Sequence, residues 1–273
     1  MKLLKLLFNF YLNASIHVAL SAVAFLKITA LYFNLDNNTA LNCFLFFGTI
    51  TGYNFVKYAG VAKLHHRSLT NTLKAIQLFS LFSFVGLCYF TFQIDTHTLC
   101  YVLPFGVLTV LYAVPFLSGF EKNLRQVSYL KIVVVALVWT GFTVLIPIID
   151  AQKAINTQLI FMLLQRFLIV VILILPFDIR DVKYDAISLQ TIPKKIGVEK
   201  TKKLGLILMI FSLIIEYLAS SSYMVKTPFM VFFFLTLLFL MRSKINQSKY
   251  YSSLWVEALP IIWWLILLGF DNF

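Results

Sequence analysis

Long apolar runs alternate with short polar stretches along almost the whole chain. A helix that crosses the hydrocarbon core of a bilayer needs about 20 predominantly apolar residues, and nine runs come close to that length. They cover residues 14–33, 39–58, 75–93, 98–118, 129–149, 157–177, 204–222, 227–241 and 254–270. No polar linker or low-complexity tract separates them. The pattern predicts one all-α integral membrane domain over residues 1–273, a bundle of nine transmembrane helices.

The first residues, MKLLKLLFNFYLNAS, mix leucines and aromatics with two lysines. No small-x-small cleavage pattern follows them, so a signal peptide is not indicated. A short amphipathic helix in the membrane interface is expected instead, with Lys2 and Lys5 reaching toward the headgroups.

Composition and charge agree with a membrane protein. The 273 residues are 60% hydrophobic and 12% charged, against about 45–50% and 25% in soluble domains. If the N-terminus is cytoplasmic, 19 of the 23 Lys and Arg residues fall at the cytoplasmic side, as the positive-inside rule requires. The net charge of +12 therefore indicates topology and not nucleic-acid binding. We expect a multi-pass protein of a bacterial inner membrane.

Three aspartates follow the sixth apolar run, in the stretch PFDIRDVKYDAISLQTIPKKIGVE. Asp178, Asp181 and Asp185 are spaced i, i+3 and i+7, so they share one face if the helix continues past the proline. Carboxylates this close repel one another unless a cation lies among them, and Mg²⁺ is a natural occupant because it prefers oxygen ligands. The alternative is a solvated loop whose acids are neutralised by neighbours such as Arg180 and Lys183.

The run D-I-R-D-x-x-x-D, followed by T-I-P-x-x-I-G, resembles the second aspartate-rich motif of the UbiA-type intramembrane prenyltransferases. In that family the motif follows the sixth of nine membrane helices on the cytoplasmic side. The resemblance implies transfer of a polyprenyl group from its diphosphate to an aromatic or other hydrophobic acceptor. It implies that Asp178, Asp181 and Asp185 hold Mg²⁺, that Asp181 and Asp185 act in catalysis, and that Arg180 neutralises diphosphate oxygens.

The family's first motif, approximately N-x-x-x-D-x-x-x-D, is incomplete in this chain. The matching stretch reads YNFVKYAGVA, which keeps Asn54 as a substrate-binding residue but has Tyr58 and Ala62 at the aspartate positions. In one interpretation Lys57 and Arg67 replace the missing ion as fixed charges that bind the diphosphate. In the other, catalysis is lost, and the protein binds an isoprenoid or quinone lipid or serves as a membrane assembly partner.

A weaker resemblance involves the stretch LYAVPFLSGFEKNLRQVSYLK, after the fourth run. It is similar to the family's Tyr-small-x-Pro turn and to the lysine that opens the fifth helix. The resemblance implies that Tyr112 and Lys131 face the diphosphate, whereas the positive-inside rule accounts for the lysine nearly as well.

Four charged residues lie within the predicted spans: Lys27, Arg166, Glu216 and Glu257. An ionised side chain at the centre of a bilayer costs at least about 2.5–3.5 kcal/mol on insertion scales. We expect these residues to pair with one another inside the bundle, and an acceptor-binding role is the alternative. Some of the aromatic residues, which make up 16% of the chain, would line the isoprenoid tunnel and stabilise an allylic cation.

Overall fold

The apolar runs fold as helices in a computed structural model, which describes residues 2–58, 70–114, 124, 130–183, 191–219 and 222–271. No strand occurs in these ranges. The α-helices are α1 (Lys2–Asn13), α2 (Ile16–Phe33), α3 (Thr39–Tyr58), α4 (Asn71–Thr91), α5 (Thr96–Ala113), α6 (Leu130–Thr140), α7 (Ile146–Asp150), α8 (Thr157–Asp181), α9 (Ile192–Ile196), α10 (Val198–Ala219), α11 (Tyr223–Arg242) and α12 (Leu259–Asp271). Two π-helical segments, η3 (Gly141–Leu145) and η4 (Tyr251–Val256), precede α7 and α12.

Seven helical stretches within the described ranges are long and apolar enough to cross a membrane. They are Ile16–Phe33, Asn71–Thr91, Thr96–Ala113, Leu130–Asp150, Thr157–Asp181, Tyr223–Arg242 and Tyr251–Phe270. The protein is therefore an all-helical integral membrane protein. Helices α3 and α10 coincide with two more of the predicted runs but are not among these seven, so the count of nine transmembrane helices is not confirmed.

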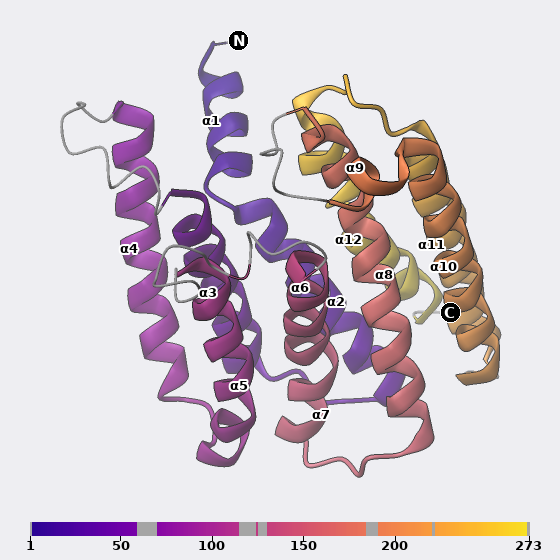
Figure 1. Ribbon diagram of the computed structural model, residues 1–273. Coiled ribbons are helices and arrows are strands. Elements are labelled where there is room, and N and C mark those ends of the chain that lie inside the picture. The colour runs from indigo at the N-terminus through magenta and orange to yellow at the C-terminus, as the bar shows by residue number, and fades with distance from the viewer. Residues whose placement is uncertain are drawn as a thin grey trace.

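The helices stand side by side in one bundle (Figure 1). Helix α8 packs against α6 and α10, while α3 packs between α2 and α4. The core around Trp263 is aromatic: its ring stacks on Phe232 with centroids 4.6 Å apart and meets Phe229 edge-on at 5.3 Å. The end of α8 lies at the same end of the bundle as the N-terminus (Figure 1). That end contains the charged residues described below.

Two of the intramembrane charges are buried in the bundle and form no ion pair with any residue of the described ranges. Arg166 is fully buried, donates to the carbonyl of Phe25 at 2.8 Å and lies 4.1 Å from the Phe25 ring centroid. Glu216 accepts a hydrogen bond of 2.9 Å from the hydroxyl of Tyr32, and Lys27 donates to an asparagine side chain. Neutral groups therefore hydrogen-bond to these charged side chains, in place of the direct pairing that the sequence led us to expect.

Candidate functional site

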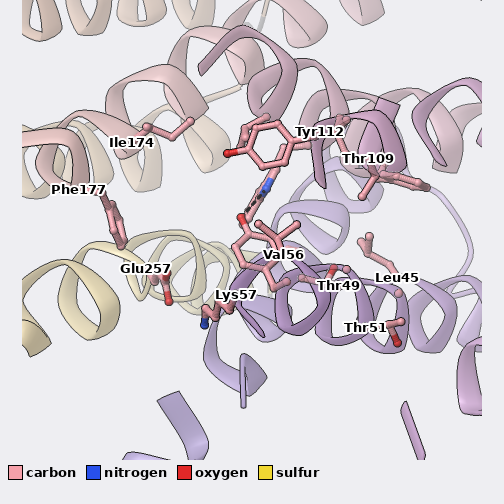
Figure 2. A pocket seen from close by; sticks show the side chains of 18 of the residues that line it. Leu45, Thr49, Thr51, Val56, Lys57, Thr109, Tyr112, Ile174, Phe177 and Glu257 are labelled. Atoms are coloured by element: carbon pink, nitrogen blue, oxygen red, sulfur yellow. Dashed lines mark hydrogen bonds between the residues drawn. The ribbon is translucent and has the colours of Figure 1, made fainter. Parts of the chain in front are cut away.

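A cavity of about 740 Å³ opens between α1, α3, α5, α6, α8 and the C-terminal segment. Most of its lining is apolar or aromatic, including Phe44 and Phe142. Figure 2 shows Ile174 and Phe177 on the same lining. The charged groups in the described lining are four basic and three acidic side chains, a net charge of +1: Lys57, Lys131, Arg180 and Lys249 with Asp178, Asp181 and Glu257. An apolar chamber that carries a group of charges can accommodate an amphiphile with a charged head and a hydrocarbon tail.

The end of α8 places two of the predicted aspartates at this cavity. The helix continues through Pro176 as far as Asp181, so Asp178 and Asp181 lie one helical turn apart. Asp178 is fully buried, and its Oδ1 lies 2.7 Å from Nζ of Lys131. Asp181 is about one-third exposed and accepts hydrogen bonds from Nε and Nη2 of Arg180 at 2.7 and 3.1 Å. The structure thus brings together three residues of the aspartate-rich motif and Lys131, which the weaker resemblance had singled out.

The oxygen donors of this wall suit a hard divalent cation. Mg²⁺ commonly binds one or two carboxylates and completes its octahedron with waters and substrate phosphates, and Asp178 and Asp181 supply two carboxylates that line the cavity. Within the described residues no group of three His, Cys, Asp or Glu side chains could hold a metal. Asp185, the third predicted ligand, lies outside the described residues. Asp178 and Asp181 therefore fit a Mg²⁺ ion that is shared with a phosphate-bearing ligand.

Helix α3 forms another wall of the cavity and contributes one basic side chain, Lys57, to its described lining. The buried side chain of Asn54 accepts from Ser15 Oγ at 2.8 Å and donates to Ser80 Oγ at 2.8 Å, and it is not among the cavity-lining residues. Lys57 does line the cavity, and its Nζ donates to Ser15 Oγ at 2.8 Å. Asn54 thus supports the position of Lys57 through a shared serine, and its substrate contact stays a prediction. Arg67 lies outside the described residues.

Aromatic side chains of α3, α5 and α6 line the cavity next to the charged end. Nε1 of Trp139 donates to the hydroxyl of Tyr53 at 3.0 Å, with ring centroids 6.3 Å apart. Tyr112 also lines the cavity (Figure 2), where the sequence resemblance had placed it near the substrate. The hydrogen bond fixes the orientation of two aromatic rings beside the apolar chamber.

Two further charged residues line the cavity: Lys249, which the sequence did not assign to a site, and Glu257, for which an acceptor-binding role was only the alternative. Lys249, on the segment before η4, donates to Asn9 of α1 at 3.3 Å. Glu257, directly after η4, lines the cavity, and its charge acts on Lys57. The pKa of the Tyr11 hydroxyl on α1 is raised mainly by burial and to a smaller extent by the charge of Glu257. An acidic residue within an apolar run was a sequence signal for Glu257. Its neighbours in the cavity lie on distant segments of the chain, so the sequence could not identify them.

Comparison with solved structures gives the fold. A UbiA homologue from Archaeoglobus fulgidus bound to GPP and Mg²⁺ is 11% identical, with a TM-score of 0.62 over 96% of this chain and 100% of the homologue. The same homologue bound to DMAPP and Mg²⁺ gives a TM-score of 0.62 at 12% identity, over 95% and 99% of the two chains. A digeranylgeranylglyceryl phosphate synthase is 15% identical, with a TM-score of 0.55 over 98% of each chain. No family model matches the sequence, and no curated protein does.

These likenesses extend over nearly the full length of both chains, so the arrangement of the whole bundle is shared. At 11–15% identity they define the fold and not the reaction. The chain has the UbiA-type prenyltransferase fold, as the motif around Asp178 and Asp181 led us to expect.

Proposed function

We propose that the protein is a Mg²⁺-dependent membrane prenyltransferase that moves a polyprenyl group from its diphosphate to an aromatic or lipid acceptor. The observation that carries the proposal is the end of α8, where Asp178 and Asp181 lie with Lys131 and Arg180 beside an apolar cavity. Two structures with the same fold contain a prenyl diphosphate and Mg²⁺. We treat residues 1–273 as a single domain dedicated to this reaction.

The diphosphate would lie between α8 and the α3 wall. Asp178 and Asp181, with Asp185 by resemblance, would hold Mg²⁺, which when bound offsets the negative charge that develops on the leaving diphosphate. Lys131 and Arg180 would exchange part of their contact with the aspartates for diphosphate oxygens, to which an arginine can donate two parallel hydrogen bonds. Lys57, with Arg67 by sequence, would supply fixed positive charge where the first motif lacks its acids.

The apolar part of the cavity would accommodate the polyprenyl chain and exclude water. The bond between C1 and the bridging oxygen breaks, and its electron pair leaves with the diphosphate. Tyr53, Trp139 and Phe177 would stabilise the resulting allylic cation through their ring faces. The acceptor then donates an electron pair to C1 and gives up a proton, which completes the transfer. Exclusion of water matters here because water would otherwise capture the cation.

A second candidate function is binding of an isoprenoid or quinone lipid without turnover. The observation in its favour is that α3 carries Tyr58 where the family has an aspartate, and that the hydroxyl of Tyr58 donates to the carbonyl of Asn13 at 3.0 Å. A non-catalytic protein of this kind would bind the lipid in the same cavity but would not require Mg²⁺.

For membrane orientation we propose that the N-terminus and the aspartate-rich end of α8 are cytoplasmic, in a bacterial inner membrane. The two lie at one end of the bundle (Figure 1), and the positive-inside rule assigns that end to the cytoplasm. A water-soluble cysteine reagent applied to intact cells should label single cysteines at the opposite end only.

The test of the proposed function is diphosphate release from a radiolabelled polyprenyl diphosphate by the purified protein in vesicles with Mg²⁺. We expect release by the wild type and loss of at least about 100-fold in Asp181→Asn, since the variant lacks a metal-facing charge. Asp95→Asn is the matched control, because Asp95 is exposed at the start of α5, at the other end of the bundle. Donor binding of equal strength in all three proteins, without release and without Mg²⁺ dependence, would favour the non-catalytic function.

A further inference from the structure

Glu257 places a carboxylate at the cavity, and the proposed binding of the prenyl diphosphate does not use this carboxylate. It follows the π-helical turn η4, and Figure 2 shows it beside Lys57 and Phe177 on the cavity wall. The turn is held by helix α2, because Nε2 of His17 on that helix lies 2.9 Å from the carbonyl of Leu254. Irregular π-helical turns within helices frequently occur at functional sites, where they redirect a side chain. The fold therefore places this carboxylate at the cavity through a fixed local distortion.

The carboxylate oxygens of Glu257 accept no hydrogen bond and form no ion pair within the described part of the chain. Lys57 and Arg180 act on Glu257 through their charges, while their own hydrogen bonds within the described residues go to Ser15 and Asp181. The oxygens of a carboxyl group accept hydrogen bonds in either protonation state. A carboxylate in a mostly apolar cavity is costly unless a donor reaches it. The site thus has the chemistry to bind a ligand that carries a hydrogen-bond donor.

The position of Glu257 relative to α8 and α3 indicates which ligand supplies the hydrogen-bond donor. Asp178 and Asp181 lie on α8, whereas Glu257 enters from the C-terminal segment and faces Lys57 of α3. The described residues do not assemble Glu257 and the two aspartates into a metal site. A prenyl diphosphate offers only acceptor oxygens, so it cannot donate a hydrogen bond to Glu257. A neutral hydroxyl on an apolar molecule satisfies both the carboxylate and the apolar lining.

We propose that Glu257 is an acceptor-binding residue, which accepts a hydrogen bond from a neutral alcohol or phenol group of the prenyl acceptor. This inference rests on the proposed prenyl transfer and names the acceptor class: a hydroxyl-bearing apolar molecule with no negative charge at that end. The aromatic pair Tyr53 and Trp139 lines the same cavity. It offers flat surfaces against which the body of such an acceptor can pack.

The test measures binding alone, in the absence of donor and Mg²⁺. The probes are 2-naphthol and its methyl ether, 2-methoxynaphthalene. They share the same ring system, and in the ether a methyl group replaces the hydroxyl hydrogen. Binding is followed by probe fluorescence with the purified protein in one detergent. Because a hydrogen bond contributes about 0.5–1.5 kcal/mol net, we expect the wild type to bind 2-naphthol about two- to tenfold more tightly than the ether.

The variants separate recognition by Glu257 from loss of structure. Glu257→Leu should bind both probes equally, and Glu257→Gln, whose amide is close in size and still accepts a hydrogen bond, should retain a reduced preference. Asp181→Asn should keep the full preference, because the aspartate belongs to the donor side. Equal binding of the two probes by the wild type, no binding of either, or an undiminished preference in Glu257→Leu would overturn the proposal. Diphosphate release is measured separately, so failure of the proposed reaction is distinguishable from failure of this site.

Discussion

Replacement of Lys131 by methionine tests how the charged end of the cavity is built. Lys131 Nζ lies 2.7 Å from Oδ1 of Asp178, which is fully buried, while the lysine side chain is 19% exposed. Removal of one partner leaves a buried carboxylate without its counter-charge, which costs about 3–5 kcal/mol in buried pairs. The residual exposure of the lysine places the expected loss at the lower end of that range. For a chain of this size, we expect the melting temperature to fall by roughly 6–12 °C.

The same variant also reports on Mg²⁺. In the absence of Lys131, a divalent cation can take the place of its positive charge beside Asp178, so millimolar Mg²⁺ should restore part of the lost stability. Mg²⁺ should have no such effect in the double variant Lys131→Met with Asp178→Asn. The assay is thermal unfolding in detergent, followed by tryptophan fluorescence with and without Mg²⁺. Lys249→Met is the control, since Lys249 is exposed and makes a hydrogen bond of 3.3 Å to Asn9. An unchanged melting temperature in Lys131→Met, or equal Mg²⁺ stabilisation with and without Asp178, would refute the reasoning.

Three further predictions concern the diphosphate, the packing and the metal. Lys57→Met should raise the dissociation constant of geranyl S-thiolodiphosphate about tenfold through loss of a charge-assisted contact, and an unchanged calorimetric affinity would exclude Lys57 from the site. Gly205→Ala should lower the free energy of unfolding by about 1–3 kcal/mol. The new Cβ would lie 2.4 Å from Cδ2 of Leu240 and 2.9 Å from Cδ1 of Leu175, and both leucines are buried. A melting temperature equal to that of the wild type would contradict this packing. Chelation of Mg²⁺ should stop diphosphate release, and a Mg²⁺ titration should be hyperbolic, whereas a steeply cooperative curve would indicate a second ion.

The helical architecture could be predicted from the sequence because it follows from local composition. Runs such as 157–177 are long and apolar, and the bilayer leaves them few alternatives to a helix. The helix ends were less accurate. Helix α8 extends to Asp181, beyond the predicted end at residue 177, and Gln247 and Ser252 of a distant segment donate hydrogen bonds to the carbonyl of Pro176. That contact depends on the tertiary fold and has no local signal.

The candidate site could be predicted where a motif lies on one helix. Asp178 and Asp181 reach the same cavity because three residues make about one helical turn. The approach of Glu257 to Lys57 could not be predicted, since these residues are 200 positions apart and meet only through packing of the final helix against the bundle. In the same way, Asn54 matches a family motif in sequence, but its hydrogen bonds to Ser15 and Ser80 are tertiary contacts.

The most direct measurement of the central claim is an experimental structure with Mg²⁺ and geranyl S-thiolodiphosphate, a donor analogue that resists ionisation. We predict a Mg²⁺ ion that contacts Asp178, Asp181 and the diphosphate oxygens, with Lys57 on the opposite side of the diphosphate. The geranyl tail should extend past Tyr53 and Trp139. A diphosphate bound elsewhere, or an analogue bound in the cavity with no metal at the aspartates, would contradict the account.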